Sequence, residues 1–590
     1  MDDVPGRCSA GLTVADTPDN GHYVAVEGTV AQAQAAFATT LGEYSAYGRT
    51  LRAPETVPSV PADLAGTVSA VVGLDDSAQL VVADRAAGNG PDQTHGAPGV
   101  GFRAGDPCAS YYGSSTVTVT GGPTLPLAPC GYSPAQVRGL YGLTPADTGA
   151  GQTVAFVGAN ASPTLVQDVA AYSAKHGLPA ASIKQIVAPG VYKHPETPKQ
   201  SPGDFYGEET LDAEAIHTTA PGAGLLFVGS SNADQDFDAS INHIVDKHLA
   251  SIISISYGFG GEAVPQGFIN SLDKTFQQAV ATGVGVFVSS GDSGDEAASG
   301  TVQPDFYAND PYVTAVGGTS AAIVPATGTA PLVAQTSGRA DATVAPEFGS
   351  RSSSALTAAA NWTREFEVGW QTGLTPVTGG PIIPTTSGSS AYTLPGTVGA
   401  LSGTLNGGAG GGVSRVFAEP SYQRAAGITA SGRSVPDIAA LADPNTGLLV
   451  GQTQQFPDGT YYDEYRIGGT SLAAPLMAGI AADANQRAGH ALGFLNPLIY
   501  SAYDRGAGSS EAAASSTPLY DPDQADLRST PAVLRVNYRD NVSAASGRTY
   551  SIRTLEADSL TTLDTRRDYD GSTGVGAPNG DAFLAAVAGR

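Results

Sequence analysis

The sequence predicts an α/β fold in which helices cover both faces of a parallel sheet, with a smaller α+β unit in front of it. The first observation is a series of continuous apolar runs at residues 153–157, 225–228, 252–255 and 284–288, separated by segments of helix length. Such runs are typical of strands buried on both faces, and their alternation with helices is typical of parallel sheets. The second is the length of 590 residues, which exceeds one ordinary core and favours two unequal domains.

The composition favours a compact protein and excludes some partners. Apolar residues make up 41% of the chain and charged residues 14%, as in a folded, turn-rich globular protein. The formal net charge of -26 argues against nucleic acids and anionic membranes, which would be repelled. It also suits acid tolerance, because protonation relieves the repulsion between carboxylates. No apolar run approaches the roughly 20 residues that span a bilayer.

The N-terminal unit and two long segments complete the organisation. Residues 22–26 predict a strand, Val30 to about Leu41 a helix, and residues 56–82 a further strand and helix. Residues 86–107, rich in Gly, Pro, Asp and His, predict an exposed, cleavable linker. Residues 336–412, rich in Gly, Ser and Thr, predict an elaborated surface loop with a flexible hinge.

The chain has three cysteines, Cys8, Cys108 and Cys130. The last two flank a short segment rich in Gly, Thr and Pro, and we expect one disulfide between them, which suits an oxidising compartment. Two buried free thiols are the alternative, and Cys8 is left over. Residues 1–5 have neither the basic nor the apolar segment of a secretory signal.

A candidate nucleophile, Ser471, stands at the start of an apolar helix. Residues 469–475 read Gly-Thr-Ser-Leu-Ala-Ala-Pro, and we expect the proline in the first turn, where amides have no partner inside the helix. Backbone amides and the helix dipole favour developing negative charge at this place. An ordinary capping serine is the alternative.

Two carboxyl groups provide a candidate base in place of a histidine. Residues 207–217 predict a helix on which Glu208 and Asp212 lie about 40° apart, so they can share a proton. Both cannot comfortably ionise, so one can act as a base at acidic pH. His217 lies about 180° from Glu208 and is expected to be structural. A solvated acidic helix face is the alternative.

Asp292 is a candidate group for an oxyanion hole. It follows the strand at 284–290, within Gly-Asp-Ser-Gly at 291–294. A protonated Asp292 could donate a hydrogen bond worth about 2.7 to 4 kcal/mol, whereas an ionised one would repel an oxyanion, which again indicates acidic pH. The alternative takes Ser293 as the nucleophile of a chymotrypsin-like protease, but the two β-barrels and the histidine segment of that fold are not apparent.

These three motifs, in this order, resemble the sedolisin family of serine-carboxyl peptidases, which have a subtilisin-like fold. The resemblance covers nearly the whole chain. It implies Ser471 as nucleophile, Glu208 as general base, Asp212 as the carboxyl that orients Glu208, and Asp292 as oxyanion donor. Subtilisins themselves carry Asp-Thr-Gly or Asp-Ser-Gly after the first core strand, where this chain has Gly158-Ala159-Asn160, and His-Gly-Thr-His, which it lacks.

The resemblance also implies a precursor that removes its own N-terminal part in acid. Residues 1–85 would be a partial, ferredoxin-like prodomain, 86–107 the linker with the processing site, and 108–590 the catalytic domain. We expect a secreted, extracellular monomer whose signal peptide is missing from this sequence through truncation or a misassigned start. Its partners would be polypeptide substrates and its own prodomain, with no nucleic acid or membrane.

Family members bind one calcium ion near the C-terminus. The resemblance assigns carboxylate ligands to Asp540 and Asp570, and backbone carbonyls to Asn541, Arg566 and Asp568, because Ca²⁺ takes six or more oxygen ligands. The two glycines of the family's Gly-x-Gly-Trp-Asp are absent. An acidic surface loop is the alternative.

The function that follows is an acid-active serine-carboxyl endopeptidase working through an acyl-enzyme on Ser471. Kumamolisins, within the family, extend the proton relay with a glutamate after the first strand and a tryptophan in Ser-Trp-Gly. This chain has Ser256-Tyr257-Gly258 instead, which suggests a shorter relay, and the strand near 256–260 should line the substrate cleft. The alternatives are a tripeptidyl-peptidase of the same family and a catalytically silent precursor that binds peptides.

Overall fold

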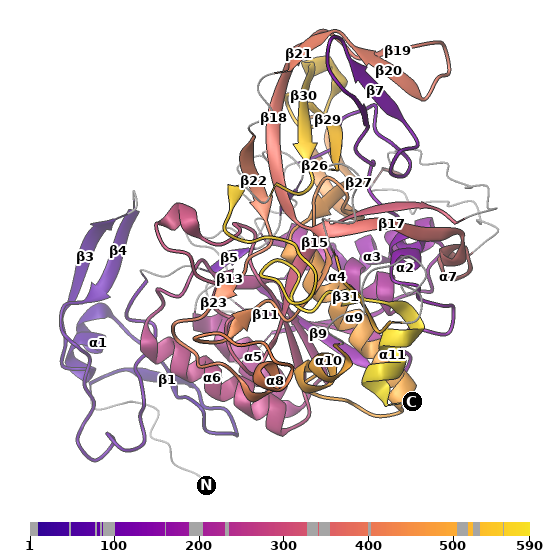
Figure 1. The fold of residues 1–590 in the computed structure, drawn as a ribbon. Helices are drawn as coiled ribbons and strands as arrows, with labels where there is room; N and C mark the ends of the chain where they lie inside the picture. The colour runs from indigo at the N-terminus through magenta and orange to yellow at the C-terminus, as the bar shows by residue number, and fades with distance from the viewer. Residues whose placement is uncertain are drawn as a thin grey trace.

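The structure is a computed structural model that describes residues 10–46, 49–76, 80–82, 85–86, 101–159, 161–187, 205–230, 235–326, 340–341, 354–398, 403–503, 517–522, 531–557 and 560–589. Its main body is built around an eight-stranded sheet in the order β10-β11-β9-β12-β14-β15-β17, with β25 also paired to β15 (Figure 1). The strands are β9 (Thr153–Ala159), β10 (Ser182–Val187), β11 (Gly224–Ser230), β12 (Ile252–Ile255), β14 (Gly285–Ser289), β15 (Thr314–Pro325), β17 (Trp362–Gly369) and β25 (Ile438–Leu441). All pairs are parallel except β15 with β17, and the predicted α/β fold is confirmed.

Helices cover both faces of this sheet, as the continuous apolar strands require. Alternate residues of β9 point to opposite faces: Phe156 joins one buried cluster and Val157 the other. The first face is covered by α2 (Pro134–Leu140), α3 (Leu165–His176), α4 (Tyr206–Thr219), α9 (Thr470–Ala488) and α11 (Gly580–Ala588). The second face is covered by α5 (Gln235–Lys247) and α6 (Gln266–Ala281).

The N-terminal unit is a small α+β layer at the left of Figure 1. It contains β1 (Thr13–Asp16), β2 (Ala25–Glu27), α1 (Val30–Ala36), β3 (Leu41–Ala46) and β4 (Arg49–Pro54). Helix α1 begins as predicted, with a Thr29–Gln32 capping box, but it ends five residues early because Leu41 opens a strand. The helix predicted within residues 56–82 is wrong for the described residues 56–76, which form turns and irregular chain.

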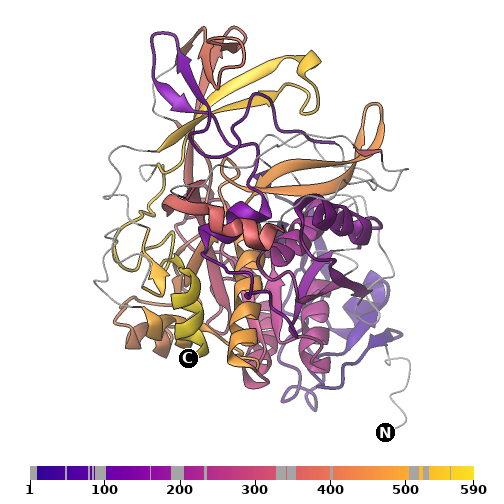
Figure 2. The same cartoon turned by 90° about the vertical axis from the view of Figure 1, so that its right-hand side faces the viewer.

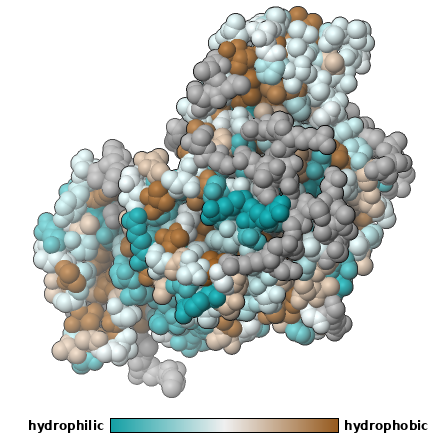
Figure 3. Space-filling view, viewed as in Figure 1, coloured by the Kyte–Doolittle hydropathy of each residue, from teal (hydrophilic) through white to brown (hydrophobic). Residues whose placement is uncertain are grey.

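This N-terminal unit contacts the outer surface of α5 and α6. Asn20 Nδ2 donates to Asn242 Oδ1 (2.7 Å) and Gln278 Oε1 (2.9 Å), and Lys247 pairs with Asp19. In the space-filling view the unit projects from the main body (Figure 3). These contacts are polar, and apolar residues meet elsewhere: Val71 and Leu74 line one pocket together with Phe268 of α6.

A lobe of β-strands stands above the main body in Figures 1 and 2. Three distant parts of the chain supply its strands: β7 (Thr116–Val119), β8 (Thr124–Pro126), β18 (Gln371–Gly379), β19 (Ile383–Pro384), β20 (Ala391–Leu394), β21 (Gly396–Val398), β22 (Thr404–Gly408), β29 (Ala532–Tyr538) and β30 (Arg548–Thr554). The lobe has its own buried cluster, which includes Val117, Val377 and Leu534. The prediction of a surface loop at 336–412 is therefore wrong over its described part from 362 to 408, where most residues are in strands.

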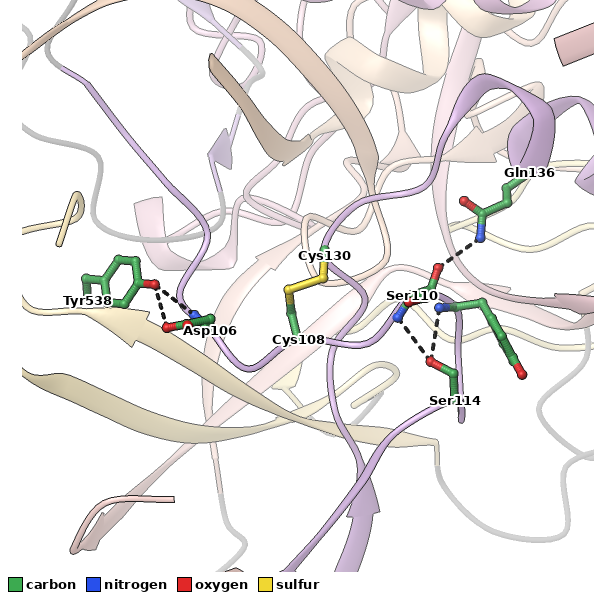
Figure 4. The surroundings of a disulfide bond; sticks show 8 residues. Asp106, Cys108, Ser110, Ser114, Cys130, Gln136 and Tyr538 are labelled. Carbon is green, nitrogen blue, oxygen red and sulfur yellow. Dashed lines mark hydrogen bonds between the residues drawn. A yellow bond between two sulfur atoms is a disulfide. The ribbon is translucent and has the colours of Figure 1, made fainter. Parts of the chain in front are cut away.

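The predicted disulfide between Cys108 and Cys130 is present at the base of this lobe (Figure 4). Beside it, Tyr538 Oη donates to Asp106 Oδ1 (2.5 Å), and Gln136 Nε2 donates to the carbonyl of Ser110 (3.1 Å). The bridge therefore lies where the start of the main body meets both the lobe and α2.

The remaining elements connect these layers. They are β5 (Leu80–Val82), β6 (Arg85–Ala86), β13 (Tyr257–Phe259), β16 (Ala340–Asp341), β23 (Gly412–Val413), β24 (Ser434–Val435), β26 (Leu448–Phe456), β27 (Gly459–Gly468), β28 (Leu519–Tyr520), β31 (Ala577–Pro578), α7 (Ala355–Ala358), α8 (Ser421–Ala425), α10 (Asn496–Ala502) and three 3-10 turns at Ala297–Ser299, Ala359–Asn361 and Ala544–Ser546. Over the described residues, every helix is too short or too polar to cross a bilayer.

Candidate active site

Ser471 lies in the first turn of α9 and is buried between α4 and the carboxyl ends of the central strands. The preceding Gly469 has φ +106°, a conformation that favours glycine, and it turns the chain from β27 into the helix. Pro475 is the sixth helical residue rather than a first-turn residue as predicted. Because proline has no N–H, the Ser471 carbonyl lacks its usual partner four residues on.

Ser256 contacts Ser471 and connects it to Asp212 of α4. The Ser471 hydroxyl donates to the Ser256 carbonyl (3.1 Å). The Ser256 hydroxyl donates to Asp212 Oδ1 (2.6 Å) and lies 3.2 Å from the Ser471 carbonyl. The nucleophile candidate and one of the predicted carboxyl groups therefore meet at a single buried serine.

All faces of helix α4 are buried, including those that carry its acidic residues. Glu208 and Asp212 are each 1% exposed, which excludes the alternative of a solvated acidic face. Glu209 points elsewhere and accepts from the Ser162 amide (2.5 Å) and Gln185 Nε2 (2.9 Å); Glu214 accepts from the Gly451 amide (2.8 Å). Burial raises the pKa of both Glu209 and Glu214 well above the ordinary range, so these two helix acids hold protons in mild acid.

His217 lies away from this site, as predicted. Its side chain is buried, its Nε2 is 3.0 Å from the carbonyl of Pro179, and burial lowers its pKa to about 4. A neutral imidazole held by a backbone carbonyl on the far side of α4 has a structural role.

Asp292 lies across from Ser471, at the carboxyl end of β14. Its Oδ1 accepts from the amide (2.8 Å) and the hydroxyl (2.9 Å) of Thr470, the residue before Ser471. The Gly291 amide also donates to the Thr470 hydroxyl (3.0 Å), which ties the loop to the start of α9. These two bonds fix the Asp292 carboxyl beside the residue that precedes Ser471.

The Asp292 loop is also held from the lobe side. The Gly408 amide donates to the Asp292 carbonyl (3.0 Å), and the Gly410 amide donates to the Gly291 carbonyl (2.8 Å). Added methyl groups at Gly410 would lie 2.0 Å from the Ser290 carbonyl oxygen, so the close approach requires glycine. The glycine run at 407–412 is therefore a packed element beside the site rather than the predicted flexible hinge. The parallel-sheet fold also excludes the chymotrypsin-like alternative with Ser293.

The five residues predicted to bind calcium lie in two different parts of the chain's structure. Asp540 Oδ1 accepts from the amides of Val542 (3.0 Å) and Ser543 (2.8 Å), in the turn that leaves β29, so Asn541 lies there as well. Asp570 lies further along the chain than β30, in a turn that packs against the main body: the Gly574 amide donates to the Asp570 carbonyl (3.1 Å), and the next amide, of Val575, donates to the Asp437 carbonyl (2.9 Å). Asp540 is exposed in the turn between β29 and β30, whereas Asp570 is buried, so their carboxyl groups have different surroundings.

A different acid, Asp521, lies beside the loop that contains Arg566, Asp568 and Asp570. Asp521 Oδ2 accepts from the Asp568 amide (2.9 Å), and β28, which precedes Asp521, pairs with β31, which follows the loop. The sequence signal was present: Asp521 directly follows a short strand and Asp540 stands two residues after β29, but strand pairing alone decides between them. Among the described residues, no group of three or more acidic, histidine or cysteine side chains could hold a metal.

Two family models match this chain. Residues 8–77 match the activation domain of pro-kumamolisin, and residues 153–497, more than half of the chain, match the subtilase family. The N-terminal match covers the α+β unit, and the second match covers the central sheet together with α4, the Asp292 loop and Ser471.

Several bacterial proteins are similar to this chain in sequence. Kumamolisin of Bacillus sp. (strain MN-32) is 30% identical over 63% of this chain and 55% of its own length. Xanthomonalisin of Xanthomonas sp. (strain T-22) is 26% identical over 84% and 53%, and sedolisin of Pseudomonas sp. (strain 101) is 25% identical over 82% and 67%. The chain thus spans about half to two thirds of the length of these relatives.

A solved structure of Pseudomonas sedolisin, a serine-carboxyl proteinase in complex with two molecules of pseudo-iodotyrostatin, aligns with a TM-score of 0.49 at 21% identity. The alignment covers 78% of this chain and 98% of that one.

Proposed function

Because this chain belongs to the subtilase family, on its sedolisin branch, we propose that it is an acid-active serine-carboxyl endopeptidase made as a self-processing precursor. The observation that carries the proposal is the buried meeting of Ser471, Ser256 and Asp212, with Asp292 held against Thr470. A capping serine would need none of these partners.

In this proposal Ser471 is the nucleophile and Glu208 its general base. The Ser471 hydroxyl proton passes to the Glu208 carboxylate as Oγ attacks the carbonyl carbon of the scissile peptide. The C–N bond then breaks, the leaving amine takes the proton from Glu208, and water later hydrolyses the acyl-enzyme by the same exchange in reverse. Asp212, one helical turn from Glu208, orients it and is itself fixed by the Ser256 hydroxyl.

Asp292 and the start of α9 would stabilise the oxyanion. Asp292 in its protonated form donates to that oxygen, and the helix N-terminus adds the field of its free amides. The requirement for a proton on Asp292 supports activity at acidic pH.

Three variants test these roles, with cleavage of a protein substrate followed between about pH 3 and 8. Ser471→Ala and Glu208→Gln should abolish cleavage while leaving the thermal unfolding midpoint close to that of the wild type. Glu209→Gln is the matched control, since Glu209 neighbours Glu208 but bonds to Ser162 and Gln185 instead. Full activity of Ser471→Ala, or a wild-type optimum above pH 7, would refute the assignment.

We also propose one calcium ion at the loop of residues 566–576, with carboxylates from Asp570 and Asp521. The Asp570 carboxylate is buried, and the groups that hydrogen bond to it are neutral: the amides of Ser572 (2.8 Å) and Thr573 (2.7 Å) and the Thr573 hydroxyl (2.8 Å). A buried carboxylate of this kind suits a hard cation with oxygen ligands. The ion would hold the loop against β28 and has no part in the peptide chemistry.

The organisation of the precursor is part of the same proposal. Residues 1–85 act as prodomain, which the match of residues 8–77 supports, and 108–590 act as the catalytic domain. We propose further that the enzyme is secreted and monomeric. It acts on polypeptides rather than on nucleic acid or membranes. Recovery of activity from the culture medium, at the elution volume of a monomer, checks these two points.

A further inference from the structure

Three arginine side chains, Arg466, Arg535 and Arg553, are buried where the lobe meets the main body, and we call them the arginine cluster. Arg466 comes from β27, and the other two come from the neighbouring lobe strands β29 and β30. Arg535 pairs with Ser551, two residues before Arg553, so both lobe arginines lie on the same face of their sheet. The three side chains are only 3%, 2% and 4% exposed in the order given, so the fold encloses three guanidinium groups.

The turn between β25 and β26 connects the lobe arginines to β27. Asn445 in this turn accepts from Arg535 Nη1 (3.1 Å). On its other side the turn packs against the end of β27, since a methyl group added at Gly447 would lie 1.9 Å from the carbonyl oxygen of Ile467, the residue after Arg466. The lobe and the main body thus each bring arginine to the same turn.

The three positive charges act on one another. Burial, together with the charges of Arg466 and Arg553, lowers the pKa of Arg535 well below its ordinary range. Burial also lowers the pKa of Arg466 and of Arg553 to about 10. Among the described residues, Asp443 is the one carboxyl group that opposes all three shifts. Because a guanidinium keeps its proton in proteins, these shifts indicate positive charge that the fold does not balance.

The hydrogen bonds of the arginine cluster go to neutral groups and leave donors over. Arg535 Nε donates to Asn537 Oδ1 (2.8 Å), and Arg553 Nε donates to Ser551 Oγ (3.0 Å). Nε and Nη1 of Arg466 are buried and have no hydrogen-bond partner in the protein. Leaving N–H groups of a charged side chain buried and unpaired is costly, so these donors indicate a further acceptor.

Two other buried arginines show how this fold otherwise balances such a charge. Arg433 contacts both carboxylate oxygens of Asp437, at 2.5 and 2.7 Å. Arg138 donates to the carbonyls of Thr218 (3.3 Å) and Thr219 (2.5 Å), at the C-terminal end of α4, where the helix dipole supplies partial negative charge. The arginine cluster differs from both, because three cations share one carboxyl group.

We propose that the arginine cluster binds one small inorganic anion, a halide such as chloride. An anion of this kind accepts N–H bonds from several directions and reduces the excess of positive charge that Asp443 leaves. The low exposure of all three arginines excludes a peptide, a nucleotide or another large anion, and it favours a single atom.

The ion would join the lobe to the strand that leads to the nucleophile. Arg466 stands five residues before Ser471, near the end of β27, whereas β29 and β30 belong to the lobe. The bound ion would therefore stabilise the attachment of the lobe to the main body. It has no part in the peptide chemistry, and the inference does not depend on the proposed peptidase function.

The first test measures the thermal unfolding midpoint of the full chain at pH 7. Sodium chloride or sodium bromide replaces sodium gluconate from about 1 to 300 mM at constant ionic strength. The midpoint should rise by about 2 °C or more with either halide, because the ion binds the folded chain and not the unfolded one. An equal midpoint in all three salts would overturn the inference.

The second test repeats this measurement with variants. Arg466→Gln should lose the response to chloride, and in gluconate it should be at least as stable as the wild type because one of three like charges is gone. Arg424→Gln is the control, since the Arg424 side chain is 65% exposed and pairs with Glu419, and it should keep the full response. A response to chloride that survives in Arg466→Gln would overturn the inference.

The third test needs no variant, so it holds even where Arg466→Gln fails to fold. Crystals of the wild-type chain grown in sodium bromide should show anomalous scattering from one ion between the three guanidinium groups. Anomalous scattering at surface positions alone, an adventitious ion only, would overturn the inference.

Discussion

Removing the Asp292 carboxyl group should separate two contributions of this residue, one to catalysis and one to stability. In Asp292→Ala the oxyanion loses a donor, for which loss of about 2.7 to 4 kcal/mol, or roughly 10² to 10³ in kcat, is typical. The Thr470 amide and hydroxyl also lose the acceptor that they contact at 2.8 and 2.9 Å. A buried donor left without a partner costs about 1 to 3 kcal/mol of unfolding free energy.

The assay is steady-state cleavage of a peptide substrate at pH 4, with thermal unfolding followed in parallel. We expect kcat to fall by the stated amount and KM to change little, because the oxyanion forms only after binding. Asp295→Ala is the control: Asp295 lies on the same loop but accepts from the Thr562 (2.7 Å) and Ala297 (3.1 Å) amides, so it should lower stability and spare kcat. A folded Asp292→Ala with less than a tenfold fall in kcat would refute the oxyanion role.

Three further predictions concern stability. Burial raises the pKa of Asp168 to about 6, so protonation of its carboxyl stabilises the fold by about 3 kcal/mol below pH 4, and this stability is lost as the pH rises through 6. Asp168→Asn should therefore narrow the difference between the thermal unfolding midpoints at pH 4 and pH 7. An unchanged difference would contradict this. A chelator should lower the midpoint of the wild type and of Asp540→Asn but not of Asp570→Asn, and indifference of the wild type would remove the calcium proposal. Arg433→Ala leaves the buried Asp437 carboxylate without its bidentate partner at 2.5 and 2.7 Å, so chemical denaturation should show a loss of about 3 to 5 kcal/mol; a loss under 1 kcal/mol would contradict it.

The sequence predicted the elements that a short run of residues identifies, such as buried strands and helix starts. The apolar runs at 153–157 and 284–288 became β9 and β14, and the acidic segment at 207–217 became α4. The helical spacing predicted that Glu208 and Asp212 share one face of this helix, and the Gly-Thr-Ser motif placed Ser471 at a helix start. These patterns involve residues that are close together in the chain, so a single sequence is enough to recognise them.

Other parts depended on pairing between distant residues, which no local pattern reveals. Ser256 was expected only to line the cleft, yet its hydroxyl and carbonyl connect Asp212 to Ser471. Asp540 and Asp521 both follow strands, and only the pairing of β28 with β31 shows which lies near Asp570. Strand β18, within the segment at 371–408, pairs with residues 550–554 of β30, a contact that the local sequence does not show.

The lobe has a consequence for how the protein is made. Its sheet joins β18 to β30, and its small core needs Val117, Val377 and Leu534 together. A ribosome would therefore have to deliver almost the entire chain before the lobe could close, while β22 at its base already contacts the Asp292 loop through Gly408. Contacts this far apart in sequence form slowly. The peptidase site would thus be completed late in synthesis, after the N-terminal unit has had time to fold.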